Sequence, residues 1–381
     1  MVIGQDITVV GGGIGGVAAG AALAMRGASV RVLEQAPALT EVGAGLQISP
    51  NGMRVLHALG VDVAGGMPAG SVELRDGLTG RLVLHQDLGG QDYRLWHRAD
   101  LLGALVSRAR ELGVAIETGR RVQSVRQVHS WIELTDAEGV REDAAVLIAA
   151  DGIHSVLRAA LNPDEGDPFF TRQVAWRAVI PGDGISHPAG ARIWMGPGRH
   201  LVSYPLRGGT MINLVGIQER RDWTGESWIR QGDPIAMRQA FDAFVRAREM
   251  LGRVETVNQW GLHRHPVAPI WSLPRAAILG DAAHPTLPFM AQGANMALED
   301  AWVLADCLAR NTPEIGLSEY AALRRPRVNR IVGVANRNAQ IYHQRGPLRG
   351  LQLGVMSLGG KLFPRIPQAH YRWIFDHDVT A

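Results

Sequence analysis

Cysteine and long apolar runs are scarce in this sequence, and each scarcity excludes a class of protein. Cys307 is the only cysteine among 381 residues, which rules out an internal disulfide framework and any zinc or iron–sulfur site built from several cysteines. No apolar run approaches the roughly 18 residues of a membrane-spanning helix, and no signal-peptide pattern opens the chain. We therefore expect a soluble protein of the cytoplasm, a reducing compartment, with no membrane partner and no metal site.

Lysine is nearly absent as well. Lys361 is the only lysine among 39 basic residues, so the other 38 are arginine. Lysine normally dominates titration between pH 9 and 11, and its absence lets a formal charge of only +3 give a sequence pI of 9.4. The arginines form no run, and their densest cluster, residues 324–330, is typical of a helix surface. We expect no nucleic-acid partner, and the shortage of lysine also disfavours Schiff-base and pyridoxal-phosphate chemistry.

Length and segment order favour two domains and an α/β fold. At about 150 residues per domain, 381 residues make roughly two domains. Short apolar segments of strand length alternate with helical segments, which is typical of a parallel, doubly wound sheet. We predict strands over residues 6–10, 29–34, 144–150 and 276–280, and helices up to residue 27 and over residues 293–310.

Residues 166–274 follow a different pattern. Turn signals recur at short intervals and runs such as residues 201–204 alternate, which predicts a mostly antiparallel sheet with one helix near residues 235–251. Residues 70–95 contain strands of the same kind, so this second domain interleaves with the first. We predict a first domain of residues 1–69, 96–165 and 275–340, a second domain of residues 70–95 and 166–274, and a C-terminal helical segment of residues 341–381.

A glycine-rich turn between the first strand and the first helix carries the first chemical signal. Its glycines include Gly11, Gly13, Gly15 and Gly16. The Gly-x-Gly-x-x-Gly spacing exposes backbone N–H groups to a pyrophosphate and lets helix and strand pack closely. Glu34, with Gln35 beside it, ends the second strand 23 residues after Gly11, where a carboxylate can accept hydrogen bonds from both hydroxyls of a ribose. This pattern predicts an adenine dinucleotide site but leaves FAD and NAD as alternatives.

Later segments decide between these two cofactors. Residues 280–285 close a buried strand and put Asp281 at its carboxyl end, where open α/β sheets bind ligands. Residues 291–295 then open a helix whose N–H groups and positive dipole end can stabilise the negatively charged edge of a reduced flavin. Asp151, followed by Gly152, ends the other buried strand. FAD is favoured because a plain NAD-dependent dehydrogenase has no use for the Asp281 segment.

With these motifs the sequence resembles, over nearly its whole length, the FAD-dependent aromatic hydroxylases of the salicylate hydroxylase and p-hydroxybenzoate hydroxylase type. It is most similar to the subgroup that includes 3-hydroxybenzoate 6-hydroxylase and 6-hydroxynicotinate 3-monooxygenase. The matching segments are the glycine-rich turn with Glu34 and residues 43–52, 97–101, 149–152 and 280–285. The resemblance implies an α/β fold in which a Rossmann-like FAD-binding domain interleaves with a mostly antiparallel β-sheet substrate domain, followed by C-terminal helices.

The resemblance also implies a reaction and a set of cofactor contacts. NADH or NADPH reduces FAD, and O₂ adds at flavin C4a to give a hydroperoxide that hydroxylates a small aromatic substrate, a phenolic or hydroxy-heteroaromatic acid. The enzyme would be a monomer or a homodimer. By the resemblance, Arg98 binds the pyrophosphate, Asp281 the ribityl chain, Pro285 the C4a/N5 edge, Gly293 and Ala294 the pyrimidine ring, Gln47 the flavin and Val122 the adenine, and Asp151 belongs to the same site.

A base is needed because electrophilic oxygen attacks a phenolate more readily than a phenol, and histidine has a suitable pKa. Residues 199–205 match the family segment in which the histidine, His200, faces the substrate hydroxyl and the tyrosine, Tyr204, lines the pocket. On a strand, residues 200, 202 and 204 share one face, so both side chains can point inward. His200 is our candidate base, and a structural or exposed histidine is the alternative. Weaker candidates are His263, His265 and His284.

Two departures leave parts of the function open. Pro288 and Phe289 stand where some relatives carry a polar substrate-binding side chain, so the acidic group of the substrate has no assigned partner, and Arg177 and Arg192 are the candidates. Flavin-dependent halogenases share the glycine motif but need a lysine between flavin and substrate, which this chain lacks. An FAD-binding redox sensor or a non-hydroxylating flavin oxidoreductase would keep the cofactor motifs without needing His200, and this remains the alternative function.

Overall fold

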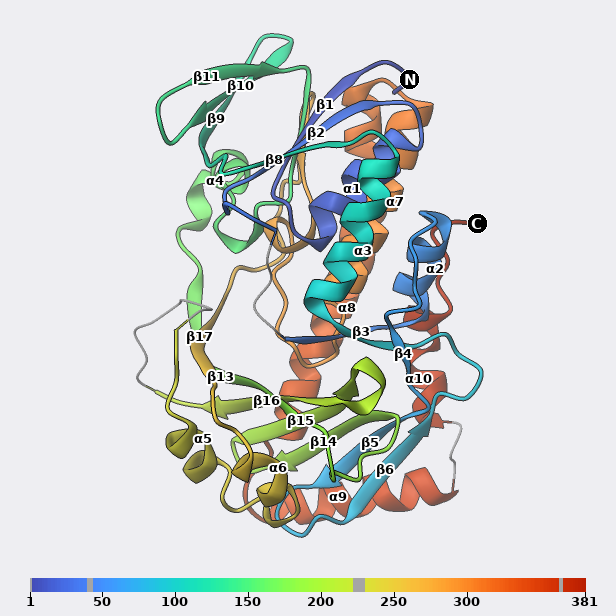
Figure 1. Ribbon diagram of the computed structural model, residues 1–381, viewed down its shortest axis with the longest axis vertical. Coiled ribbons are helices and arrows are strands. Elements are labelled where there is room, and N and C mark those ends of the chain that lie inside the picture. The colour runs from blue at the N-terminus through green and yellow to red at the C-terminus, as the bar shows by residue number, and fades with distance from the viewer. Residues whose placement is uncertain (1, 40–43, 222–229, 363–365) are drawn as a thin grey trace.

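The computed structural model describes residues 2–39, 44–221, 230–362 and 366–381, so residue 43 of the motif over residues 43–52 lies outside it. Figure 1 shows a parallel sheet with its helices at one end of the molecule and a larger antiparallel sheet at the other. The long helix α8 (Pro313–Tyr342) runs from the first region toward the second. Among the described residues, no helix is both long and apolar enough to cross a membrane.

The first region is built on a six-stranded sheet. Its strands, in spatial order, are β18 (Ser272–Leu273), β19 (Ala276–Ile278), β12 (Val146–Ala149), β1 (Asp6–Val10), β2 (Ser29–Glu34) and β8 (Ala115–Thr118). All neighbours pair in parallel except β18 with β19. Because β1, β2, β12 and β19 run in one direction, their carboxyl ends meet at the same edge of the sheet, and this edge carries the predicted motifs.

The six-stranded sheet lies between a layer of helices and a smaller sheet (Figure 1). The helices are α1 (Ile14–Ala24), α3 (Arg98–Glu111) and α7 (Gly293–Arg310), and the smaller sheet contains β9 (Val122–Val128), β10 (Trp131–Asp136) and β11 (Arg141–Ala144). Both faces of β1 and β12 are therefore covered, which explains why their residues are apolar and buried. The helix α1 approaches β1 closely because most of its residues are glycine or alanine.

Short elements connect this region to the rest of the chain. They are β3 (Gly45–Ile48), β4 (Met67–Pro68) and β7 (Arg94–His97), which form a three-stranded sheet, and the helices α2 (Pro50–Ala58) and α4 (Val156–Leu161).

The second region is a seven-stranded sheet made from two separate segments of the chain. Its strands, in spatial order, are β17 (Asn258–Arg264), β13 (Phe169–Pro181), β16 (Met211–Glu219), β15 (Arg199–Leu206), β14 (Gly190–Gly196), β5 (Ser71–Asp76) and β6 (Leu82–Asp87). Only the β14–β5 pair is parallel. The predicted fold class, with a mostly antiparallel sheet interleaved in the sequence of a Rossmann-like region, is confirmed. The exact domain boundaries stay predictions.

The two faces of the seven-stranded sheet pack against different parts of the molecule. The face that carries Trp176, Trp194 and Leu201 packs against α5 (Pro234–Ala240) and α6 (Arg248–Gly252). The prediction of a single helix near residues 235–251 is wrong, because the structure has two short helices there, α5 and α6. The break occurs where Phe241 and Phe244 turn into the core together, and the Phe241 ring lies so close to β16 that a Cβ at Gly216 would be 2.6 Å from it.

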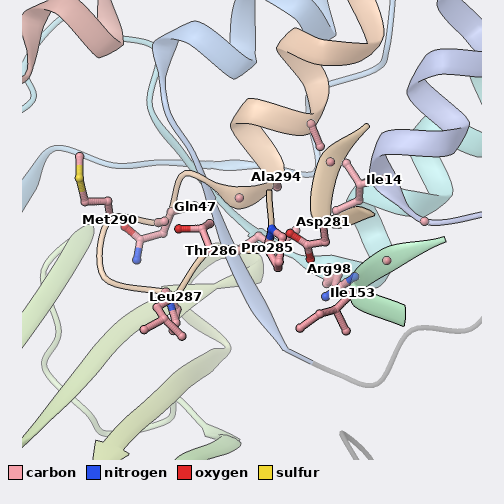
Figure 2. A pocket seen from close by; sticks show the side chains of 18 of the residues that line it. Ile14, Gln47, Arg98, Ile153, Asp281, Pro285, Thr286, Leu287, Met290 and Ala294 are labelled. Carbon is pink, nitrogen blue, oxygen red and sulfur yellow. The ribbon is translucent and has the colours of Figure 1, made fainter. Parts of the chain in front are cut away.

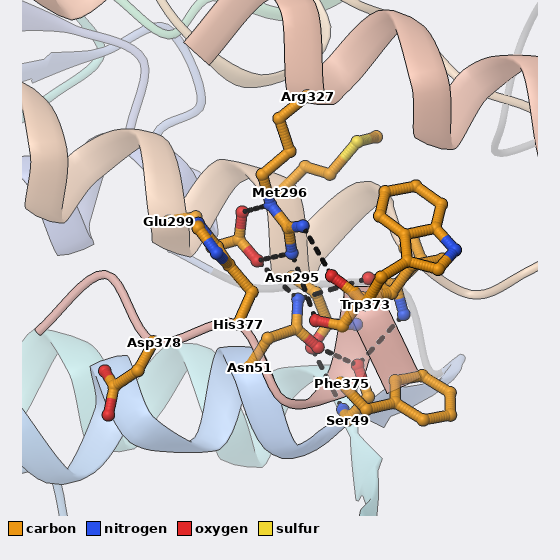
Figure 3. A network of polar contacts seen from close by, with 12 residues as sticks. Ser49, Asn51, Asn295, Met296, Glu299, Arg327, Trp373, Phe375, His377 and Asp378 are labelled. Carbon is orange, nitrogen blue, oxygen red and sulfur yellow. Dashed lines mark hydrogen bonds and ion pairs between the residues drawn. The ribbon is translucent and has the colours of Figure 1, made fainter. Parts of the chain in front are cut away.

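The C-terminal part contains α8, which lies almost wholly before residue 341, and then α9 (Gly346–Leu362) and α10 (Ile366–Phe375). Figure 1 shows α9 beside β6 at the end of the molecule that holds the seven-stranded sheet, and the C-terminus beside α2. Arg327 of α8 donates hydrogen bonds at 3.1 Å to the backbone oxygens of Trp373 and Ile374 (Figure 3). Arg54 of α2 donates one at 2.6 Å to the backbone oxygen of Phe375. The last residues are thus fixed against the first region.

Candidate active site

A cavity of about 860 Å³ is lined by residues from both regions. Of the sixteen residues predicted for the cofactor and the chemistry, fifteen line it, and Gly16 is the exception. Figure 2 shows part of the wall, where Asp281, Arg98 and Ile153 lie together and Pro285, Thr286 and Gln47 follow toward the seven-stranded sheet. The structure therefore brings together predicted residues that are up to 283 positions apart in sequence, since the cavity wall includes both Gly11 and Ala294.

The glycine-rich turn has the geometry of an anion site. Gly11 has φ of +106°, and a Cβ there would lie 2.3 Å from the backbone oxygen of Ala150. A Cβ on Gly16 would lie 1.9 Å from the backbone oxygen of Gly11, so Gly16 serves the packing of α1 on β1. Gly13 begins α1 without a side-chain cap, and a Cβ there would meet nothing within 4 Å. The first N–H groups of α1 thus face open cavity, where a pyrophosphate can accept them.

Glu34 is held at the carboxyl end of β2. Its carboxylate accepts hydrogen bonds from the backbone N–H of Gly12 at 2.6 Å and of Ala36 at 2.8 Å. This fixes one acidic group where the ribose of an adenine dinucleotide binds in such folds. Gln35 and Val122 line the same end of the cavity. Sequence reasoning missed the neighbouring residues Arg120, Arg121 and Gln123, which also line it and carry no motif.

Two carboxylates stand at the ends of the buried strands, and burial raises the pKa of both. The pKa of Asp151 is raised to about 6, although hydrogen bonds from Ser155 and Val156 oppose the shift. Asp151 Oδ2 accepts from the Val156 N–H at 3.0 Å, whereas Oδ1 has no hydrogen-bond partner in the described structure. The pKa of Asp281 is also raised by burial, with His284 and Arg98 opposing. Acceptors of this kind fit the hydroxyl groups of a bound ribityl chain or ribose.

A buried acid cluster supports this edge of the sheet, and we use that name for Glu299, Asp300, His284, Arg324 and Arg327. Asp300 accepts hydrogen bonds from the Gly280 N–H at 3.1 Å, from His284 Nε2 at 2.5 Å and from Arg324 Nε at 2.8 Å. His284 is fully buried and does not line the cavity, so its position is structural. Sequence reasoning missed the cluster because its members look like ordinary helix-surface charges.

The other carboxylate of the cluster, Glu299 of α7, joins the start of α2 to α8 (Figure 3). Glu299 accepts from Asn51 Nδ2 at 2.6 Å and from Arg327 at 2.8 Å, and it pairs with Arg324 at 2.7 Å. Asn295 accepts from the Ser49 N–H at 3.0 Å. These bonds hold the start of α7 against the end of β3, the strand that carries Gln47.

The middle of the cavity combines a helix N-terminus with buried polar atoms. The helix α7 begins at Gly293 without a side-chain cap, and Gly293, Ala294 and Pro285 line the cavity there. Gln47 Oε1 accepts a hydrogen bond from Tyr93 at 2.8 Å. Thr286 Oγ1 is buried without a hydrogen-bond partner in the described structure. Uncapped N–H groups and an unsatisfied hydroxyl are suited to the polar edge of a flavin ring, so the residues present fit FAD.

His200 lies at the far end of the cavity on β15. His200, Val202 and Tyr204 all line the cavity while Leu201 packs on the opposite face, as the strand alternation predicts. The His200 ring is 1% exposed, and burial together with His343 lowers its pKa well below the ordinary value. It is therefore neutral near pH 7 and can act as a base. Burial raises the pKa of Tyr204, which stays protonated.

The wall around His200 is mostly apolar. Phe289 and Tyr342 place their rings 5.2 and 5.3 Å from the His200 ring. Further apolar residues line this end: Val72, Leu74, Ile193, Val215, Leu287, Ile341 and Met356. Such a wall fits a flat aromatic ring, with few polar groups to orient it.

The structure distinguishes the two arginine candidates for the acidic group of a substrate. Arg177 lines the cavity and lies near enough to Tyr204 to affect its pKa. Arg192 lies on the opposite face of the sheet, where it donates a hydrogen bond to Glu73 at 2.9 Å. Of the weaker histidine candidates on this side, His263 lines the cavity and His265 does not.

A dinucleotide-binding edge that opens into an apolar pocket with one neutral histidine defines a flavin-dependent oxidoreductase. Residues 5–335 match the protein family described as FAD binding domain. Two curated relatives are 36% identical: 3-amino-4-hydroxybenzoate 2-monooxygenase of Streptomyces cremeus, over 88% of this chain and 87% of the relative, and 3-hydroxybenzoate 6-hydroxylase of Polaromonas naphthalenivorans, over 89% and 88%. A solved salicylate hydroxylase with bound substrate has a TM-score of 0.83 and 24% identity, over 99% of this chain and 96% of that one.

This chain belongs to the FAD binding domain family. It is a FAD-dependent monooxygenase. The predicted cofactors, FAD with NADH or NADPH as electron donor, are confirmed, without a choice between the two donors. The solved neighbour confirms the fold.

Proposed function

We propose that this monooxygenase hydroxylates a small aromatic acid that carries a ring hydroxyl, either a phenol or a hydroxylated nitrogen heteroaromatic. The observation that carries the proposal is His200, a buried, neutral base at the apolar end of the cavity. When bound, FAD takes electrons from NADH or NADPH and activates O₂ for transfer of one oxygen atom. The names of the curated relatives, which include hydroxybenzoate hydroxylases, support this substrate class.

The residues of the chain have distinct parts in this reaction. The glycine-rich turn, Glu34, Arg98 and Asp281 would hold the cofactor, and Pro285 with Gly293 would border its ring. His200 Nε2 accepts the proton of the ring hydroxyl, which gives the electron-rich phenolate. Arg177 binds the carboxylate of the substrate, since charge-assisted hydrogen bonds to arginine fix a carboxylate in place. Tyr204 and the apolar wall orient the ring and exclude water.

The reaction also suggests where the enzyme works. A single, buried cysteine and the consumption of NADH or NADPH support a cytoplasmic location. The small-molecule partners that we propose are the aromatic substrate, the electron donor and O₂.

The test is a panel of hydroxybenzoates, aminohydroxybenzoates, hydroxynicotinates and quinones with the FAD-loaded enzyme. Oxidation of NADH and of NADPH, peroxide release and hydroxylated product are measured for each compound. We expect at least one hydroxylated aromatic acid to stimulate oxidation of the donor with more product than peroxide. If no compound stimulates oxidation while FAD remains bound, the proposed substrate class is wrong.

A further inference from the structure

A chain of hydrogen bonds leads from His200 to the surface of the protein. His200 Nδ1 lies 2.7 Å from His343 Nε2, and His343 Nδ1 lies 3.0 Å from Glu219 Oε1. His200 and His343 are 1% and 4% exposed, whereas the Glu219 side chain is 38% exposed. No motif marks His343 or Glu219, and neither has a part in the site described above.

The backbone fixes the three residues relative to one another. His343 is the C-cap residue that follows α8, Glu219 ends β16, and Gly198 lies in the turn before β15. The Gly198 N–H donates to the backbone oxygen of His343 at 3.0 Å, and the Glu219 N–H donates to that of Gly198 at 2.9 Å. Gly198 has φ of +66°, a conformation that favours glycine. The alignment of the rings is therefore built into the fold.

Only one arrangement of protons satisfies this chain when Glu219 is ionised. Burial alone would raise the pKa of Glu219, but Arg345 and His343 outweigh it and lower that pKa, so the carboxylate is an acceptor. His343 Nδ1–H must then donate to Glu219, and His343 Nε2 must accept from His200 Nδ1–H. This leaves the lone pair of His200 Nε2 for the cavity, which is the form that a base requires.

We propose that His343 and Glu219 are positioning residues that form a proton relay from the substrate site to solvent, an inference that rests on the proposed function. The O–H bond of the substrate breaks as the Nε2–H bond of His200 forms. The Nδ1 proton of His200 passes to His343 Nε2, the Nδ1 proton of His343 passes to Glu219, and Glu219 releases it to water. No electron moves, and the negative charge is left on the phenolate.

The surroundings favour this direction of transfer. Burial lowers the pKa of both His200 and His343, so neither ring retains the proton. The cations that face His343 are Arg345 and Arg199, which lower its pKa further, while Glu219 raises it. Tyr342, whose ring lies against His200, stays protonated because burial raises its pKa. Neither ring therefore holds the proton near neutral pH, and Glu219, whose pKa is also lowered, releases it to water from its exposed carboxylate.

The test measures proton release, not only turnover. The FAD-loaded enzyme is mixed without O₂ or NADH with the hydroxylated aromatic acid that the panel identifies, in weak buffer containing a pH indicator. The phenolate band of the bound substrate is followed in parallel. We expect Glu219→Gln to slow proton release about tenfold or more, with unchanged substrate affinity and an apparent pKa of phenolate formation shifted upward. His343→Gln should have the same effect, and its flavin spectrum and melting temperature report whether it folds.

Arg345→Gln is the matched control. Arg345 donates a hydrogen bond to the other carboxylate oxygen of Glu219, Oε2, at 2.6 Å. This variant therefore changes the surroundings of Glu219 but leaves His343 and Glu219 themselves unchanged. Proton release near the wild-type rate is expected. The relay is refuted if Glu219→Gln releases protons as fast as wild type, or if Arg345→Gln slows release as strongly as Glu219→Gln. If no phenolic acid stimulates NADH oxidation by wild type, the proposed function itself fails.

An independent observation concerns the outer surface of α9. Five apolar side chains on this helix are each 60 to 67% exposed: Leu348, Leu351, Val355, Leu358 and Leu362. They recur at spacings of three and four residues, which is the seam of a coiled coil. The opposite side of the helix attaches it to the protein through buried Leu353 and Ser357 and through a salt bridge between Arg349 and Asp76. Figure 1 shows α9 on the outside of the molecule.

We infer that this α9 seam pairs with the α9 seam of a second copy of the chain across a two-fold axis. A seam of period 3.5 is complementary to itself, and a two-fold interface brings the same patch together from both copies. Gly354 flanks this seam, and an added Cβ there would meet nothing within 4 Å, so the protein leaves room for another helix beside it. Five side chains expose on the order of 500 Å², so a pair buries on the order of 1,000 Å², enough for a specific interface. The cations of α9 are Arg349, which pairs with Asp76, and Lys361, too little charge for an anionic membrane.

Sedimentation velocity of the FAD-loaded enzyme at micromolar concentration tests this pairing. We expect a dimer for wild type and a monomer for the double variant Leu351→Glu with Leu358→Glu, with an unchanged flavin spectrum. Leu323→Glu on α8, at an isolated leucine that is 53% exposed, is the matched control and should remain dimeric. A monomeric wild type, a dimeric double variant, or a wild type that binds phosphatidylserine vesicles as a monomer would each overturn the inference.

Discussion

His200 is the residue on which the proposed chemistry depends most. We expect His200→Ala to retain FAD, because no cofactor-binding group is removed, but to slow hydroxylation about a hundredfold at neutral pH. Raising the pH should restore part of the rate, since solvent then supplies the phenolate directly. Product formation and peroxide release are measured from pH 6 to 10 with wild type as the reference. Coupled hydroxylation at an undiminished rate at pH 7 would show that His200 is not the base.

Arg177 is expected to decide affinity rather than rate. Arg177→Met should raise KM for an aromatic acid about 10- to 100-fold with a smaller change in kcat, because a hydrogen bond to a charged group contributes about 1.5–3 kcal/mol. Arg192→Met provides the control, since Arg192 lies on the opposite face of the same sheet. Steady-state kinetics with an acid and with its amide distinguish the two variants. Equal KM increases for Arg177→Met and Arg192→Met would contradict the assignment.

Some site residues are visible in the sequence and others are not, for a physical reason. Gly11, Glu34 and Asp281 stand at strand ends with fixed spacing, and short-range geometry alone assigns them to one edge of the sheet. His343 and Glu219 are 124 residues apart, and their contact depends on how α8 ends against β16. No local pattern encodes such a contact, and only the folded chain reveals it.

At the scale of elements, two glycines of the β1–α1 turn serve different purposes: Gly16 is needed for folding and Gly13 for cofactor binding. Gly16→Ala places a methyl group 1.9 Å from the backbone oxygen of Gly11, so we expect the melting temperature of the FAD-free protein to fall by several degrees. Gly13→Ala meets no protein atom, and its φ of −75° suits alanine, so the melting temperature should not change.

The affinity for FAD tests the purpose that we assign to Gly13. The methyl group of Gly13→Ala projects where the pyrophosphate approaches α1, so we expect FAD affinity to fall about tenfold or more. Fluorescence quenching of FAD on titration with the FAD-free protein measures this. Wild-type affinity in Gly13→Ala would mean that the pyrophosphate does not bind at the start of α1.

Helices and strands were predictable where their residues are uniformly apolar or where turn residues such as glycine mark their ends. The helix α7 begins at Gly293 and ends at Arg310 as its sequence indicates. The β9–β11 sheet was not anticipated, because its strands are mostly polar and only Ile132, Leu134 and Ala144 are buried. Residues 235–251 have helical composition throughout, yet the demand of the core for Phe241 and Phe244 divides them into two helices.

At the scale of the whole molecule, the buried acid cluster joins three distant parts of the chain. Glu299 accepts a hydrogen bond from Asn51 of α2 and pairs with Arg324 and Arg327 of α8. Arg327 also donates a hydrogen bond to the backbone oxygen of Trp373 in α10. Buried charges of this kind stabilise a fold only while every partner remains ionised and bonded. The stability of the enzyme should therefore depend on the ionisation of two carboxylates that no solvent reaches.

The direction of that dependence follows from the pKa values. Although burial opposes ionisation, the neighbouring cations and hydrogen bonds lower the pKa of Glu299 and of Asp300 to about 2, below the values of about 4 for an unfolded chain. The stabilisation is therefore complete above pH 4 and is lost as the pH falls from 4 toward 2, by a few kcal/mol for each group. We expect the melting temperature of the FAD-free protein to fall steeply across this interval.

Glu299→Gln should already melt at a lower temperature at pH 7, because it leaves Arg324 and Arg327 short of a counter-charge, and its melting temperature should fall less in acid. Glu133→Gln, a surface carboxylate that pairs with Arg126, should follow the wild-type curve. Circular dichroism melts at half-unit steps from pH 7 to pH 2.5 measure all three, and a wild-type curve that stays flat below pH 4 would show that the cluster does not control acid stability.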